Sequence, residues 1–244
     1  MLLLSGTFIP PVVTSGYQPK GEYVTINGIK NYITGPETAM EAILIIYDRE
    51  LLSWAFAATD SFGFFDQTIQ GADNLAHSDP NRKYRVFMPD FFEGSPAQIS
   101  WYPPQTEEHQ KKLGEFFETK AAPAKSLAKV PTLVAQANTF VPGGKEFDKW
   151  QLFFKAAVQA HPAMLDPSDA PKVCIPMALL ASIDEPVSDV KEFESALAVP
   201  HGVETFPDQI HGWMAARSDL QNEKVRQKYQ RGYSIILDFL RKHL

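Results

Sequence analysis

The sequence predicts an α/β protein with a mostly parallel sheet, helices on both faces of that sheet, and an N-terminal β-hairpin. Short apolar runs of strand length alternate with segments of helical periodicity from Ala42 onward, which is the order of elements in α/β folds. The run Ala42–Tyr47 is apolar without interruption, as is typical of a parallel strand buried on both faces. The hairpin prediction rests on Asn27-Gly28, which lies between two runs rich in β-branched and aromatic residues.

Composition restricts the class of protein. The chain has 244 residues, 44% hydrophobic and 21% charged, which suits one globular domain or at most two small ones. No stretch indicates a domain boundary, so we expect residues 1–244 to form a single domain. The net charge is -6 with scattered Lys and Arg, which argues against a nucleic-acid surface. No run approaches the roughly 18 apolar residues of a membrane span. One cysteine excludes an internal disulfide, and we expect a soluble cytoplasmic protein.

Local signals place the elements in the first half of the chain. Asn-Gly is a preferred two-residue hairpin turn because both residues accept positive φ. A Thr followed by two Glu residues provides an N-cap and complements the helix dipole, and a proline at a helix start loses no hydrogen bond. The predicted elements are strands Glu22–Ile26, Ile29–Thr34 and Ala42–Tyr47, helix Gln67–His77, strand Tyr84–Met88, and helices Thr106–Thr119 and Pro131–Phe140.

The second half continues the alternation. Apolar runs predict strands, and segments with apolar residues three and four apart predict helices. The elements are strands Phe154–Ala160 and Val173–Leu180, helix Val190–Ala198, strand Val203–Phe206 and the terminal helix Glu223–Lys242.

An acid and a histidine follow the last two predicted strands. Asp184 comes after Val173–Leu180, and His211 comes after Val203–Phe206. In α/β-hydrolases the triad follows the chain order nucleophile, acid, histidine, each just past a strand end, so these residues match the acid and the base. Taken alone, a loop acid and a surface histidine would be the commoner interpretation. No Gly-x-Ser-x-Gly segment occurs anywhere in the chain, so the nucleophile is missing.

With these residues placed, the chain resembles the eukaryotic branch of the dienelactone hydrolase family over nearly its whole length. The resemblance implies one α/β-hydrolase domain that cleaves lactones or small carboxylic esters with a Cys-Asp-His triad and without a metal or organic cofactor. By position, Asp184 and His211 match the family's acid and base. The matching stretches are Pro10–Val13, Gly16–Gly21, Phe62–Phe65, Gln70–Asp73, Tyr84–Phe92, His161–Met164, Ala181–Asp184 and His211–Arg217.

One departure from the family concerns the nucleophile. Family members carry a Gly-x-Cys-x-Gly turn that should fall just after Trp150, and it is absent. Only about fifteen residues separate Phe140 from Phe154, whereas a βαβ unit takes roughly 30. We therefore expect one central βα unit, with the nucleophile, to be missing.

A second departure is an apparent insertion, Arg49–Thr59. It separates the Ala42–Tyr47 strand from the loop that borders the nucleophile in the family. Asp48 and Asp60 are then rival matches to the family's acidic loop residue, and Asp60 is the candidate substrate contact.

Three more residues are candidates with competing interpretations. His161, at the end of a predicted strand, faces the ligand crevice of α/β sheets or is a structural loop histidine. Arg217 resembles a family arginine that can hold a substrate carboxylate, or is a solvated surface residue. Cys174, the only thiol, begins the Val173–Leu180 strand, far from the end that leads to Asp184, and is interpreted as a buried small hydrophobe. No metal-binding spacing is present.

The sequence therefore predicts a hydrolase of lactones or small esters whose turnover is low because the nucleophile is absent. One alternative is a non-catalytic protein that keeps the crevice and binds a small molecule. Another is a non-functional isoform whose sheet lacks a central strand, since buried unpaired backbone groups cost about 1–3 kcal/mol each.

Overall fold

The structure is a computed structural model that describes residues 7–46, 56–58, 62–137, 154–163 and 165–244. Its strands are β1 (Glu22–Ile26), β2 (Ile29–Thr34), β3 (Glu41–Ile46), β4 (Phe56–Ala58), β5 (Tyr84–Pro89), β6 (Ala157–Ala160), β7 (Met177–Ala181) and β8 (His201–Thr205). Its α-helices are α1 (Asp66–His77), α2 (Glu107–Thr119), α3 (Pro123–Ala137), α4 (Val187–Ala196) and α5 (Glu223–His243), and two short 3-10 helices are η1 (Ile99–Trp101) and η4 (Pro167–Lys172).

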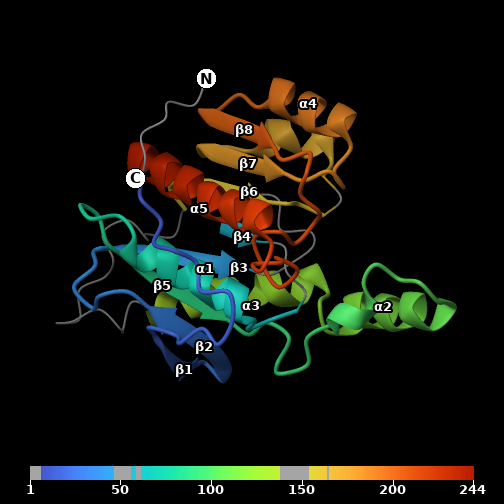
Figure 1. The fold of residues 1–244 in the computed structure, drawn as a ribbon, viewed down its shortest axis with the longest axis horizontal. Coiled ribbons are helices and arrows are strands. Elements are labelled where there is room, and N and C mark those ends of the chain that lie inside the picture. Colours follow the sequence, from blue (N-terminus) through green and yellow to red (C-terminus); the bar gives the residue numbers. More distant parts are fainter. Residues whose placement is uncertain (1–6, 47–55, 59–61, 138–153, 164) are drawn as a thin grey trace.

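These strands form one eight-stranded sheet in the order β1-β2-β5-β3-β4-β6-β7-β8. The pairs β1–β2 and β2–β5 are antiparallel, and all other neighbours are parallel. The predicted mostly parallel sheet with an N-terminal hairpin is therefore confirmed (Figure 1). No helix within the described residues is both long and apolar enough to cross a membrane.

The hairpin has the predicted ends and the predicted turn. Ile26 pairs with Ile29, and the two residues between them have positive φ, 50° at Asn27 and 75° at Gly28. This is the backbone that the strong right-handed twist of a two-residue hairpin requires.

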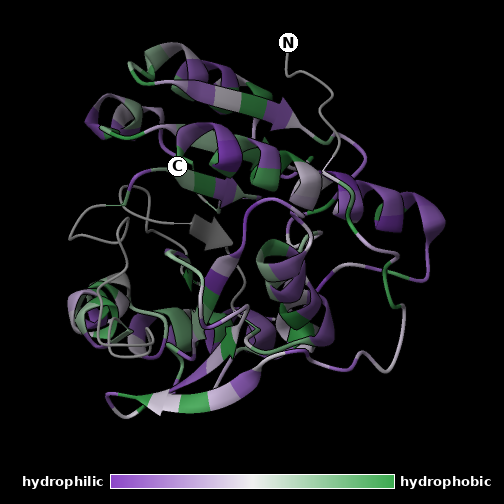
Figure 2. Cartoon of the chain, turned by 90° about the vertical axis from the view of Figure 1, so that its left-hand side faces the viewer, coloured by the Kyte–Doolittle hydropathy of each residue, from purple (hydrophilic) through white to green (hydrophobic). Residues whose placement is uncertain are grey.

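Helices cover both faces of the sheet. Successive side chains of β7 face opposite sides of the sheet. Leu180 packs in a core with α1 and α5, whereas Leu179 packs with Phe193 of α4 on the other face. A third cluster joins Phe87 of β5 to Leu133 of α3. The helix ribbons in Figure 2 alternate between hydrophilic and hydrophobic stretches, as expected for helices with one buried side.

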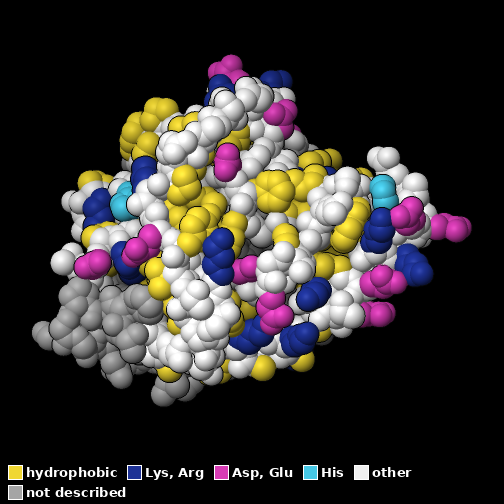
Figure 3. All heavy atoms as spheres, turned by 90° about the horizontal axis from the view of Figure 1, so that it is seen from below, with side chains coloured by type: hydrophobic (Ala, Val, Ile, Leu, Met, Phe, Trp, Pro, Cys, Tyr) yellow, Lys and Arg dark blue, Asp and Glu magenta, His cyan; other side chains and the backbone are white. Residues whose placement is uncertain are grey.

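Charges on the face drawn in Figure 3 are mixed. Lys and Arg lie among Asp and Glu without forming a continuous stripe. This agrees with the scattered basic residues of the sequence, which argued against a nucleic-acid surface.

The central strand β4 was not predicted. It belongs to the Arg49–Thr59 segment and lies between β3 and β6. Ile45 pairs with Phe56 on one side, and Ala58 pairs with Ala160 on the other. The described strands thus leave no gap at the centre of the sheet, in contrast to the isoform interpretation. The junction at Trp150, where the family's turn was expected, lies outside the described residues.

Several predicted boundaries and one predicted burial were wrong. Strand β6 begins at Ala157 rather than Phe154, and α4 spans Val187–Ala196 rather than Val190–Ala198. Helix α3 begins at Pro123, so Pro131 lies inside the helix; the strong helix formers between them extend the helix upstream. Strand β7 begins at Met177, because Pro176 has no N–H for a ladder hydrogen bond. Cys174, which precedes that strand, is exposed rather than buried.

A buried carboxylate ties the hairpin to α1. Asp73 is fully buried and accepts hydrogen bonds from Tyr17 Oη (2.6 Å), Tyr32 Oη (2.8 Å) and Thr34 Oγ1 (2.5 Å). Burial, and next the hydrogen bond to Asp73, raise the pKa of Tyr17 above its usual range. These hydrogen bonds hold β2 against α1 at the end of the sheet where β5 begins.

Candidate active site

Two loops meet where β7 and β8 end. The loop after β7 carries Asp184, and the loop after β8 carries His211. The backbone N–H of Ile183 donates to the carbonyl oxygen of Gln209 over 2.8 Å, which joins the loops. Neighbouring parallel strands end at one edge, where α/β sheets bind ligands. The structure thus brings the two sequence-predicted catalytic residues together.

The acid that contacts the His211 ring is Glu185. Its Oε1 lies 3.3 Å from His211 Nδ1, its side chain is 4% exposed, and Oε2 accepts the backbone N–H of Ser182. Asp184 is exposed, and its Oδ2 accepts the backbone N–H of His211 over 2.7 Å. Asp184 therefore holds the loop, and Glu185 holds the ring.

Sequence reasoning missed Glu185. The available signal was a second acid directly after Asp184, followed by Pro186. Which of two adjacent acids reaches the ring depends on the turn after β7, which the sequence pattern does not define.

His161 lies against His211 in a left-handed backbone conformation. Its φ is 42°, its side chain is fully buried, and its ring centroid is 5.0 Å from that of His211 at an interplanar angle of 75°. Burial lowers the pKa of His161 well below its usual range, and the nearby His211 and Arg217 act in the same direction. Non-glycine residues with positive φ occur preferentially at functional sites. The uncharged ring of His161 thus packs against the ring of His211.

Arg217 contacts the His211 loop. Its Nη1 donates to the carbonyl oxygen of His211 over 2.6 Å, and its guanidinium lies 4.7 Å from the centre of the Tyr102 ring. Gly212 has a φ of 86°, and a Cβ there would lie 3.1 Å from Arg217 Cβ. Arg217 thus packs closely on the loop that presents His211.

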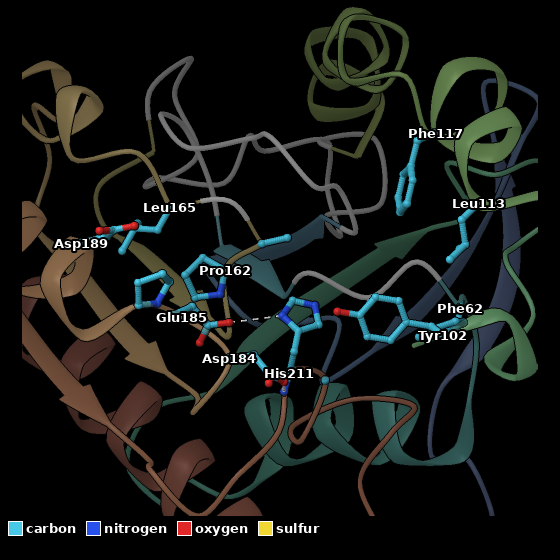
Figure 4. Close-up of a pocket in the computed structure, with 13 residues that line it drawn as sticks. Phe62, Tyr102, Leu113, Phe117, Pro162, Leu165, Asp184, Glu185, Asp189 and His211 are labelled. Atoms are coloured by element: carbon cyan, nitrogen blue, oxygen red, sulfur yellow. Dashed lines mark hydrogen bonds and ion pairs between the residues drawn. The ribbon is translucent and has the colours of Figure 1, made fainter. Parts of the chain in front are cut away.

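A cavity of about 360 Å³ opens beside His211. Figure 4 shows the pair Glu185 and His211 in the middle, with Tyr102 next to the histidine. The lining residues are Phe62, Tyr102, Leu113, Phe117, Pro162, Ala163, Leu165, Asp184, Glu185, Pro186, Asp189, His211 and Gly212. His161 and Arg217, two of the predicted substrate contacts, do not line this cavity. The third predicted substrate contact, Asp60, lies outside the described residues.

The described lining lacks the side chains that serve as nucleophiles in hydrolase triads. None of the described lining residues is Cys, Ser or Thr. Cys174 precedes β7 and Asp184 follows it, so the thiol and the acid belong to opposite ends of that strand. Among the described residues, no group of three or more His, Cys, Asp or Glu side chains could hold a metal ion.

Comparison with solved structures shows the fold. The chain is similar to a dienelactone hydrolase-like promiscuous phosphotriesterase from metagenomic libraries, at 11% identity and a TM-score of 0.53, over 88% of this chain and 92% of that one. It is also similar to the acylaminoacyl peptidase of Pyrococcus horikoshii, at 10% identity and a TM-score of 0.52, over 94% of this chain and 42% of that one. The architecture is that of the α/β-hydrolases.

Comparison with protein sequences shows the family. No protein-family model matches the chain. Two proteins of Schizosaccharomyces pombe, both named uncharacterized AIM2 family proteins, are similar over their length. One is 32% identical over 243 residues, which covers 91% of each chain. The other is 30% identical over 245 residues, which covers 92% of each chain. The chain therefore belongs to the AIM2 family and has an α/β-hydrolase fold.

Proposed function

We propose that this chain binds and slowly hydrolyses small carboxylic esters or lactones, with His211 as the general base. One observation carries the proposal: an acid–histidine pair lies at the carboxyl ends of the neighbouring strands β7 and β8 and opens into a cavity of about 360 Å³. The arrangement matches that of the acid and base of a hydrolase triad.

In this proposal each member of the pair has its own role. With Nδ1–H donating to Glu185 Oε1, the lone pair of Nε2 is free to accept a proton from an attacking group. Asp184 supports the pair from the backbone side by holding the N–H of His211. His161 and Arg217 keep the ring and its loop in place, and Asp60 remains a candidate substrate contact through the family resemblance.

In this proposal the nucleophile is water. The resemblance implies a cysteine, but the described lining offers no thiol, and its one hydroxyl is the phenol of Tyr102. His211 would remove a proton from water while the water oxygen bonds to the carbonyl carbon. The carbon–oxygen bond to the alcohol then breaks, and the imidazolium returns the proton to the leaving alkoxide. Such a site lacks the covalent step of the triad enzymes, so we expect a low rate.

A second candidate function is binding without turnover. The absence of a Gly-x-Cys-x-Gly or Gly-x-Ser-x-Gly segment favours it, because that turn also supplies a backbone donor of the oxyanion hole. In either case the partner is a small molecule, and the single cysteine is compatible with the proposed cytoplasmic location.

The test is the hydrolysis of a series of p-nitrophenyl esters by the purified chain. We expect slow release of p-nitrophenol that His211→Ala abolishes and that Cys174→Ser, which removes the only thiol, leaves unchanged. Loss of activity in Cys174→Ser would show a cysteine mechanism. Saturable ester binding without release above the His211→Ala background would establish the second candidate function.

A further inference from the structure

The two ends of the cavity differ chemically. In Figure 4, Asp189 and Leu165 lie on one side of the Glu185–His211 pair, and Phe117 and Leu113 lie on the other. Given the proposed function, we infer that the preferred substrate is an ester with an apolar acyl group and an alcohol part that carries a positive charge, such as an ammonium group. This substrate differs from the anionic, carboxylate-bearing lactones that the family resemblance suggests.

The charge of the lining carries the inference. Asp184, Glu185 and Asp189 line the cavity, and no described lining residue is Lys or Arg. Glu185 is occupied by His211 and by the N–H of Ser182. Asp184 accepts a backbone N–H, and Asp189 Oδ1 accepts the Ser188 hydroxyl over 2.9 Å. Among the described residues, neither Asp184 nor Asp189 forms an ion pair, so both carboxylates are available to a cation in the cavity.

Arg217 is not part of the cavity lining. It donates to the His211 carbonyl and stacks on Tyr102. A substrate carboxylate would therefore approach three carboxylates without a guanidinium to receive it. A cationic group on the substrate is instead attracted by each carboxylate within a few ångströms.

The opposite end suits an aryl or alkyl acyl group. Phe62 and Leu113 are buried apolar residues, Phe117 extends the same wall, and Tyr102 closes it beside His211. With the ester carbonyl at His211, an apolar acyl group fills this end, and the alcohol part extends toward Asp189.

Three benzoate esters of similar shape test the inference on the full chain. Benzoylcholine carries a trimethylammonium group, 3,3-dimethylbutyl benzoate is its uncharged isostere, and 4-(benzoyloxy)butanoate carries a carboxylate. Equilibrium binding at low ionic strength is measured by ligand-observed NMR. We expect the choline ester to bind about five- to tenfold more tightly than the uncharged ester and the anionic ester to bind most weakly.

Two variants on the same helix locate the charge effect. Asp189→Asn should reduce the preference for the cation to about twofold. Glu192→Gln is the matched control, because Glu192 is an exposed acid of α4 that does not line the cavity, and it should leave the preference unchanged. A thermal melt confirms that both variants are folded.

The outcomes separate the inference from the proposed function. Equal binding of the three esters, tighter binding of the anionic ester, or an unchanged preference in Asp189→Asn would overturn the charge selectivity and leave the proposed function standing. Failure of all three esters to bind would overturn both.

Discussion

Replacing His161 with glutamine should flatten the pH dependence of folding stability below about pH 6.5. The wild-type ring is fully buried, and burial, followed by the nearby His211 and Arg217, holds its pKa well below the ordinary 6.5. In the unfolded chain the ring is solvated and takes up a proton near its ordinary pKa. Glutamine keeps a polar side chain of similar size but does not titrate.

The sign follows from proton uptake. Because the folded-state pKa is lowered, the stability that neutral His161 provides is fully present above the unfolded-state pKa of 6.5 and is lost as pH falls toward the folded-state pKa. In that window the unfolded chain binds one more proton, so unfolding free energy falls by up to about 1.4 kcal/mol per pH unit. From about pH 6.5 to about pH 5.5 the loss integrates to about 1 kcal/mol.

Urea unfolding at a series of pH values and constant ionic strength measures this component. The free energy of unfolding of wild type minus that of His161→Gln should decrease by about 1 kcal/mol between about pH 6.5 and about pH 5.5. His201→Gln, which removes an exposed histidine at the start of β8, is the reference variant. A wild-type minus His161→Gln difference that stays constant over this range would refute the reasoning, because His161 would then titrate alike in both states.

Two further predictions concern the loops that present His211. In ¹⁵N NMR, Glu185→Gln should change the ring tautomer of His211, because Glu185 Oε1 faces Nδ1. Asp184→Asn should instead shift the backbone amide resonance of His211, because Asp184 accepts that N–H. The opposite pattern would show that the two acids have exchanged roles. Gly212→Ala should cost about 1–3 kcal/mol in urea unfolding, since φ is 86° and the new Cβ would crowd Arg217. Gly16→Ala, with a φ of 64° and open space around it, should cost less; equal costs would mean that packing on Arg217 contributes nothing.

Elements with local signals were predictable from the sequence. The hairpin turn at Asn27-Gly28 needs only positive φ at two adjacent residues. The N-cap of α2 needs only one hydroxyl, and Thr106 Oγ1 accepts the N–H of His109 over 3.1 Å. The order of strands and helices predicted the meeting of Asp184 and His211, because parallel strands end at one edge.

The parts that depend on tertiary contacts were not predictable. The three residues of β4 form a strand through pairing with β3 and β6, and such a short segment carries little pattern of its own. Pro131 was interpreted as a helix start, whereas α3 continues through it. The contact of Glu185 with the His211 ring depends on a turn geometry that two adjacent acids do not encode.

The central claim is that His211 activates water in this cavity. The most direct measurement follows p-nitrophenol release from p-nitrophenyl acetate while intact-mass spectrometry monitors the chain during turnover. We predict release that requires His211 and a chain mass that stays unmodified throughout. A transiently acylated side chain would contradict the claim by showing a covalent nucleophile, and so would release that continues unchanged in His211→Ala.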